Sequence, residues 1–154
     1  MKGKIWNGRG LGDLAKHLHS VDCVKEHDLD FVAISESGRR DFPMHTLNHL
    51  SGGIEFIWKW ITPRGRSGGI LIGVRASTFE VLDYSFGEFH IKLHLRNKSD
   101  NFIWSLVTVY GAAQNEFKAD FLRKLALNSS WAPPYTVTRL YMKLSNLLRR
   151  YSLI

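Results

Sequence analysis

The chain is poor in cysteine, it contains no long apolar run, and it has no acidic residue after Asp120. Cys23 is the only cysteine among 154 residues, so an intrachain disulfide is excluded and a reducing compartment is permitted. No run of about 18 apolar residues occurs, which argues against a membrane-spanning helix. The sequence turns polar and Gly-rich after Trp6, too early for a secretory signal core. We therefore expect an intracellular protein, whose compartment and oligomeric state the sequence does not indicate.

Negative charge is also scarce. The chain has 21 Lys and Arg against 14 Asp and Glu, a net charge of +7, which favours anionic partners such as nucleic acid. Four basic residues and no acidic ones lie in residues 128–154, so this tail supplies +4 and residues 1–127 carry only +3. Charge alone therefore does not identify the partner.

Hydrophobic periodicity predicts an α/β fold. Leu14, Leu18, Val21 and Val24 fall on one stripe of a helix that Asp13 can cap. Further along, apolar residues alternate strictly with polar ones, as in a half-buried strand, over residues 89–96. We predict strands at residues 4–6, 30–34, 54–61, 69–74, 89–96 and 102–110, and helices after Asp13, over residues 43–50 and around residues 117–125.

Polar side chains stand where three predicted strands end. Asn7 follows the first strand, Glu36 the second, and Tyr110 closes the last strand of the hairpin. Strand ends of an α/β sheet converge on one rim, which is where such folds place their sites. Taken singly, each residue is better explained as a turn-forming Asn, a solvated carboxylate or an edge aromatic.

Together these motifs resemble the endonuclease/exonuclease/phosphatase superfamily. The resemblance rests on Trp6-Asn7-Gly8-Arg9-Gly10-Leu11-Gly12, Ser35-Glu36, the segment from Gly65 to Val74 and Val109-Tyr110-Gly111, and it is strongest to the plant retrotransposon-like branch. It covers residues 1 to about 126. The implied fold is an incomplete deoxyribonuclease I-like two-sheet sandwich with flanking helices.

The resemblance implies a role for each residue at the rim. Glu36 would be a Mg²⁺ ligand, because hard cations take carboxylate oxygen and keep waters for substrate phosphate. Asn7 would assist at the metal site or position the phosphate through its carboxamide. Tyr110 would donate its phenolic proton toward phosphate oxygens. Asn7, Glu36 and Tyr110 are thus the candidate catalytic residues, with Glu36 and Asn7 at the metal.

The chain departs from the family after residue 127. Family members continue with Gly-Asp-x-Asn and close with Ser-Asp-His, whereas here the last acidic residue is Asp120 and the last histidine is His94. Groups that act as a unit in catalysis fail together when one is removed. We therefore expect a truncated Mg²⁺-dependent phosphodiesterase-like domain that is inactive by itself, or alternatively a non-catalytic nucleic-acid-binding fragment.

The tail forms the second unit of our division, residues 128–154 after a domain of residues 1–127. Trp131-Ala132-Pro133-Pro134 has the composition of a linker. From Val137 to Tyr151 the apolar residues fall on one helical stripe with basic residues elsewhere, which predicts a basic amphipathic helix. This helix could cover an open core, bind an acidic partner or membrane surface as an interaction element, or have no function.

Two other motifs suggest a hydrolase or a zinc site, but the residues around them do not support either function. Gly65-Arg66-Ser67-Gly68-Gly69 matches the nucleophile elbow of hydrolases, but that elbow needs a following helix and the next residues have a strand pattern. His90 and His94 share a strand face about 13 Å apart, too far to chelate one zinc ion. A Gly-rich turn and a solvated strand face explain them better.

Overall fold

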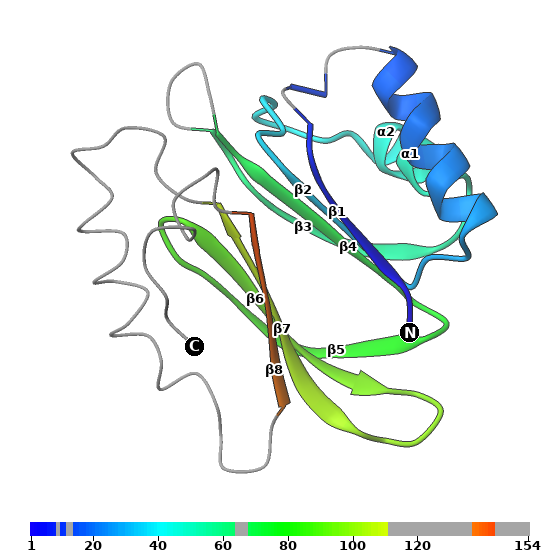
Figure 1. Ribbon diagram of the computed structural model, residues 1–154, viewed down its shortest axis with the longest axis vertical. Coiled ribbons are helices and arrows are strands. Elements are labelled where there is room, and N and C mark those ends of the chain that lie inside the picture. Colours follow the sequence, from blue (N-terminus) through cyan, green and yellow to red (C-terminus); the bar gives the residue numbers. More distant parts are fainter. Residues whose placement is uncertain (9, 12–13, 64–67, 111–136, 144–154) are drawn as a thin grey trace.

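The computed structural model describes residues 1–8, 10–11, 14–63, 68–110 and 137–143, with residues 14–17 and 137–143 described by their main chain alone. In these residues two four-stranded β-sheets pack face to face, and two helices cover the outer face of the first sheet (Figure 1). This is the α/β two-sheet architecture that the sequence predicts. None of the described helices is long and apolar enough to cross a membrane.

The first sheet has the order β1-β2-β4-β3. Strands β1 and β2 are parallel, and β4 is antiparallel to both of its neighbours. The elements of this half are β1 (Gly3–Asn7), α1 (Leu14–Glu26), β2 (Phe31–Ser35), α2 (Met44–Leu50), β3 (Phe56–Ile61) and β4 (Ile70–Arg75).

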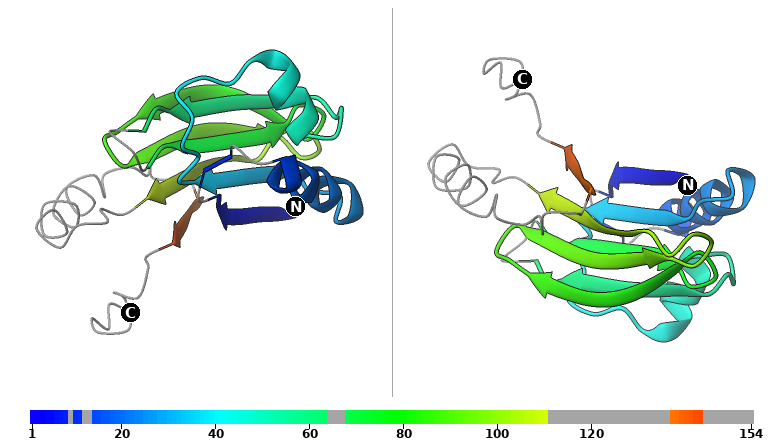
Figure 2. Two further views of the ribbon diagram at one scale, coloured as in Figure 1. Left: turned by 90° about the horizontal axis from the view of Figure 1, so that it is seen from above. Right: turned by 90° about the horizontal axis from the view of Figure 1, so that it is seen from below.

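The second sheet has the order β5-β6-β7-β8. Strands β5, β6 and β7 form an antiparallel meander, whereas β8 lies parallel to β7. Figure 2 shows β8 at the margin of this sheet, on the same side of the molecule as β1. The strands are β5 (Phe79–Phe86), β6 (His90–Asn97), β7 (Ile103–Tyr110) and β8 (Val137–Lys143).

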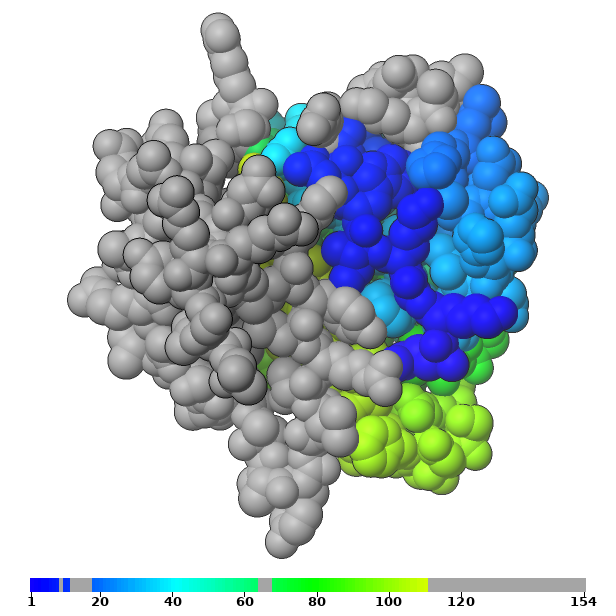
Figure 3. Space-filling view, viewed as in Figure 1, coloured from blue at the N-terminus to red at the C-terminus, as the bar shows by residue number. Residues whose placement is uncertain are grey.

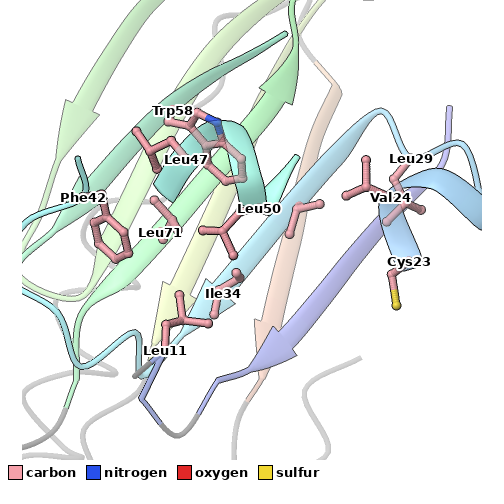
Figure 4. Close-up of a cluster of buried hydrophobic side chains, with 11 residues drawn as sticks. Leu11, Cys23, Val24, Leu29, Ile34, Phe42, Leu47, Leu50, Trp58 and Leu71 are labelled. Carbon is pink, nitrogen blue, oxygen red and sulfur yellow. The ribbon is translucent and has the colours of Figure 1, made fainter. Parts of the chain in front are cut away.

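Two hydrophobic clusters hold these layers together. One lies between the helices and the first sheet, where Val24, Leu50 and Leu71 are fully buried (Figure 4). The other lies between the sheets and contains the inward residues of β6, namely Ile91, Leu93 and Leu95. The alternation predicted for residues 89–96 is therefore confirmed, since the polar residues between them are only partly buried.

The buried face of α1 differs from the predicted stripe. Val24 is fully buried, but Leu18 is 48% exposed. Ser20 takes a place on the packed face instead, because its hydroxyl donates a hydrogen bond to the Leu50 carbonyl at the end of α2 (3.2 Å). Contact with α2 thus turns the helix away from the face that hydrophobicity alone selects.

The tail prediction is wrong for residues 137–143, which form strand β8 rather than the start of a helix. The register pairs Trp104 with Val137 and Tyr110 with Lys143. Strand β7 has six consecutive buried residues and would otherwise leave its main-chain groups on that side without a ladder, and β-branched Val137 and Thr138 suit a strand. Residues 144–154 and the helix expected around residues 117–125 lie outside the described residues.

Candidate functional site

Asn7, Glu36 and Tyr110 meet at one rim of the two sheets, and we call them the carboxylate cluster. Asn7 is the last residue of β1 and the Cα partner of Ser35, the last residue of β2, so Glu36 follows directly beside it. Tyr110 ends β7 in the other sheet. All three side chains are partly buried, so they are both held by the fold and open to solvent.

The carboxylate of Glu36 is the hub of this cluster. Its Oε1 atom accepts a hydrogen bond from Asn7 Nδ2 (2.9 Å) and another from the Tyr110 hydroxyl (2.9 Å). Neither bond uses the second carboxylate oxygen, Oε2. Two neutral donors therefore fix the orientation of the carboxylate and leave Oε2 as the atom that can bind a ligand.

The main chain at Glu36 is in the left-handed region, with φ of 54°. A residue other than glycine pays roughly 1–2 kcal/mol for this conformation, so neighbouring contacts must hold it. The Glu36 carbonyl accepts from the Gly10 amide (2.7 Å), and the Ser37 amide donates to the Gly69 carbonyl (3.3 Å). Loops on both sides thus clamp the turn that presents the carboxylate.

Gly69 lies where a side chain cannot fit. A Cβ atom there would stand 2.5 Å from the Ser37 hydroxyl and 3.2 Å from the Ile61 carbonyl oxygen, and the φ of Gly69 is 82°. Gly69, just before β4, therefore acts by close packing against the Glu36 turn. Because strand β4 follows it, the helix that a nucleophile elbow requires is absent, and that interpretation fails. Ser67 itself lies outside the described residues.

Tyr110 keeps its proton at neutral pH. Burial raises the pKa of Tyr110 to about 12, and the hydrogen bond to Glu36 and the negative charge of that carboxylate act in the same direction. The phenol is therefore a hydrogen-bond donor throughout the physiological range.

Ser37, next to Glu36, is part of the site but was not predicted from the sequence. Its side chain is fully buried, and its hydroxyl oxygen has no hydrogen-bond partner among the described residues. A buried polar atom without a partner beside a carboxylate is one that a bound water or ion can satisfy. Nothing in the sequence marks Ser37, because its burial depends on the approach of Gly69.

Glu36 fits a magnesium ion as a single carboxylate ligand. Magnesium is commonly held by one or two carboxylates while waters and substrate phosphate complete its shell. The described part of the chain contains no group of three His, Cys, Asp or Glu side chains that could hold a metal by itself. Asn7 turns its amide nitrogen toward Glu36, so in this arrangement it orients the carboxylate.

The polar face of β6 lies elsewhere and is partly neutralised. Arg96 forms an ion pair with Glu80 (2.9 Å), and Asp83 is the Cα partner of His94. Burial lowers the pKa of His90, and the positive charge of Lys92 lowers it further. The positive charges of this face are therefore partly offset by acidic residues of β5, which argues against a binding surface for a polyanion.

No protein-family model matches the chain, and no curated protein matches it. Solved structures do match. An AP endonuclease from Archaeoglobus fulgidus aligns with TM-score 0.67 at 14% identity, over 91% of this chain and 55% of that protein. D. rerio TDP2, complexed with a single-strand DNA product, aligns with TM-score 0.63 at 15% identity, over 88% and 57%.

An endonuclease/exonuclease/phosphatase family protein from Bacteroides thetaiotaomicron aligns with TM-score 0.62 at 11% identity, over 90% of this chain and 61% of that one. At such identities the likeness establishes the fold, which is the deoxyribonuclease I-like sandwich. The chain spans about 55 to 61% of the length of these three neighbours.

Proposed function

We propose that the chain is a Mg²⁺-dependent phosphodiesterase-like domain that carries one wall of a phosphate site and has no activity above background by itself. The observation that carries this proposal is the Glu36 carboxylate, which two donors from separate strands orient through one oxygen. Metal-binding carboxylates are commonly oriented by such outer hydrogen bonds.

The residues of the carboxylate cluster have separate tasks in this proposal. Glu36 binds the ion through Oε2, and Asn7 holds the carboxylate from the β1 side. Tyr110 remains protonated, so it can direct its hydroxyl either to Glu36 or to an oxygen of a phosphate bound beside it. When bound, magnesium supplies positive charge that offsets the charge developing on the phosphate.

We propose that the other side of the phosphate site, which the family builds from its Gly-Asp-x-Asn and Ser-Asp-His segments, is missing. Strand β8 follows Tyr110 in the chain and ends beside it, with Lys143 as the Cα partner of Tyr110. The seven residues of β8 include no acidic side chain, whereas the resemblance predicts a strand with Gly-Asp-x-Asn after Val-Tyr-Gly. Residues 1–127 would then be the partial family domain and residues 128–154 a sequence foreign to it.

Nucleic acid is the substrate class that we propose for this wall. The net charge of +7 favours a polyanion, and the neighbour D. rerio TDP2 was solved with a single-strand DNA product. The motifs around Asn7, Glu36 and Tyr110 support kinship with plant retrotransposon-like endonucleases. If the chain binds nucleic acid but does not cleave it, the chain is a non-catalytic nucleic-acid-binding fragment.

The test combines a cleavage assay with metal binding. Wild-type chain and Glu36→Gln are incubated with plasmid DNA and with an oligonucleotide carrying an abasic site, with and without MgCl₂, and Mn²⁺ binding is followed by electron paramagnetic resonance. We expect no Mg²⁺-dependent cleavage and weak Mn²⁺ binding that Glu36→Gln removes. Glu80→Gln is the matched control, because Glu80 is a surface carboxylate on β5 paired with Arg96.

Each result bears on a different part of the proposal. Equal Mn²⁺ binding by the wild type and Glu36→Gln would exclude Glu36 as the ligand. Mg²⁺-dependent cleavage that Glu36→Gln abolishes would show that the site is complete. The proposal that the chain is inactive by itself would then be wrong. Salt-sensitive binding of a single-stranded oligonucleotide without cleavage supports the binding fragment.

A further inference from the structure

An ammonium group, an imidazole and a thiol lie together between β1 and α1. Lys4 Nζ is 2.6 Å from Cys23 Sγ and 3.1 Å from His19 Nε2. The sulfur in turn is 3.7 Å from the same ring nitrogen. We call Lys4, His19 and Cys23 the thiol cluster. None of them belongs to the carboxylate cluster.

The local fold explains how these groups meet. His19 and Cys23 are four residues apart in α1 and so share one face of the helix. The atoms of β1 lie beside those of α1 on the face that Figure 3 shows, and Lys4 reaches His19 and Cys23 of the helix. The Trp6 ring packs edge-on against His19 with centroids 5.3 Å apart, which fixes the imidazole.

Cys23 is nearly buried but lies at the margin of its hydrophobic cluster. Its side chain is 6% exposed, and Figure 4 shows it on α1 beside Val24 and Leu29, away from Phe42 and Leu71. Lys4 is partly buried and His19 is exposed. The sulfur therefore lies beside a partly buried Lys4 and an exposed His19, where a small molecule can approach it more easily than a bulky reagent.

A cysteine on the inner face of a helix is usually an inert, small apolar residue. Cys23 differs because a cation is directed at its sulfur. The Lys4 ammonium donates one hydrogen bond to the sulfur and another to His19, so an amine nitrogen already lies within bonding reach of the sulfur. The same nitrogen becomes a nucleophile once it loses a proton, and His19 is placed to accept it.

We propose that the thiol cluster is an oxidative modification site, at which a small peroxide joins Cys23 Sγ to Lys4 Nζ through an S–N bond. In the first step the thiolate attacks one peroxide oxygen, the O–O bond breaks, and the sulfur becomes a sulfenic acid. The released hydroxide takes up a proton and leaves as water. The sulfur is oxidised by two electrons and the peroxide is reduced by two.

The second step is the condensation that sulfenic acids undergo with nitrogen. The Lys4 ammonium passes a proton to His19, and the free amine attacks the sulfur. The S–N bond forms as the S–O bond breaks, and the leaving hydroxide departs as water with the proton that His19 holds. The amine also loses its second proton to solvent, which balances the proton consumed in the first step. Thiol, amine and peroxide thus give one sulfenamide and two waters.

The crosslink would tie β1 to α1 three residues before Asn7. Asn7 orients Glu36, so the modification would fix the strand that carries one side of the carboxylate cluster. A thiol reductant would reverse it, as it does other sulfenamides. This proposal does not depend on the proposed function, because its chemistry needs neither metal nor phosphate.

The test is mass spectrometry of the full chain after treatment with hydrogen peroxide. We expect a product lighter than the reduced chain by two hydrogen atoms, in which peptide mapping joins the peptide of Lys4 to that of Cys23. Dithiothreitol should restore the starting mass. A wild-type product with added oxygen on Cys23 and no link to Lys4 would overturn the proposal, as would a disulfide between two chains.

Variants separate the crosslink from simple oxidation. Lys4→Arg keeps the positive charge but offers no amine, because a guanidinium does not lose its proton in proteins. It should stop at the sulfenic acid, which adds one oxygen to the intact mass without the loss of two hydrogen atoms. Lys2→Arg, two residues away on the exposed start of the chain, should crosslink like the wild type. A crosslink that persists in Lys4→Arg would exclude Lys4 as the partner, and the wild-type peptide map decides the matter even if a variant fails to fold.

Discussion

The Tyr110 hydroxyl donates a hydrogen bond to Glu36 Oε1 (2.9 Å) across 74 residues of chain and from one sheet to the other. Because Glu36 follows β2 and Tyr110 ends β7, this bond joins the two layers at the rim of the sandwich. It also completes the orientation of the one carboxylate that the proposed metal site needs. The bond therefore joins the sheets and, under the proposed function, also orients a metal ligand, and these two roles can be measured separately.

Tyr110→Phe should lower the free energy of unfolding by about 1 kcal/mol, since it removes one hydrogen bond to a partly solvated carboxylate. Urea denaturation followed by circular dichroism measures the change. Tyr84→Phe is the matched control, because Tyr84 is 45% exposed and the Lys59 ammonium that lies over its ring should remain there. Equal stability of the two variants would show that the Tyr110 bond does not hold the sheets together.

The phenol of Tyr110 should titrate at a higher pH than an unfolded tyrosine does. An unfolded tyrosine loses its proton near pH 10, whereas burial and Glu36 raise the pKa of Tyr110 to about 12. The stabilising effect of the protonated phenol is thus complete below pH 10 and is lost as the pH rises through 12. Phenolate absorbance should show a late step that Tyr110→Phe lacks. Glu36→Gln should move this step toward lower pH without abolishing the shift, because burial is the largest cause.

Most of the fold follows from local pattern. Strand β6 was predictable because Ile91, Leu93 and Leu95 alternate with polar residues. Strand β5 was missed because a bulge between Val81 and Asp83 shifts the register and breaks the alternation. The tail was predicted as a helix because its apolar spacing fits one, and only the open side of β7 selects the strand. The spacing of apolar residues in a segment does not indicate which strand that segment will pair with.

Part of the candidate site could likewise be predicted from the sequence, and part could not. Asn7 and Glu36 could be placed together from the sequence, since parallel neighbouring strands end at one edge. The strand-end pattern also placed Tyr110 at this rim, but that it reaches the other two from the second sheet depends on how the sheets pack. The left-handed main chain of Glu36, the burial of Ser37 and the thiol cluster depend on contacts between distant segments, which leave no periodic signal.

Gly69→Ala should destabilise the chain more than Gly53→Ala does. Both glycines have nearly the same φ, 82° and 83°, so each substitution should cost roughly 1–2 kcal/mol in main-chain strain. A Cβ at Gly53 meets nothing within 4 Å, whereas at Gly69 it overlaps the Ser37 hydroxyl. Displacing that hydroxyl should add about 1–3 kcal/mol. Urea denaturation of both variants isolates the added cost, and identical losses would show that the Glu36 turn is not tightly packed.

Deleting residues 137–154 should open one side of β7. Alternate amides of a strand point to opposite neighbours, so those directed at β8 lose their partners while those directed at β6 keep theirs. Hydrogen exchange should therefore accelerate at every second amide of Ile103–Tyr110, and the exposed edge should promote association between chains. Strand β4 is an internal reference, because β2 and β3 pair with it on both sides. Deleting only residues 144–154 leaves β8 in place and should leave β7 exchange unchanged. If the longer deletion also leaves it unchanged, the parallel pairing of β7 with β8 does not stabilise the chain.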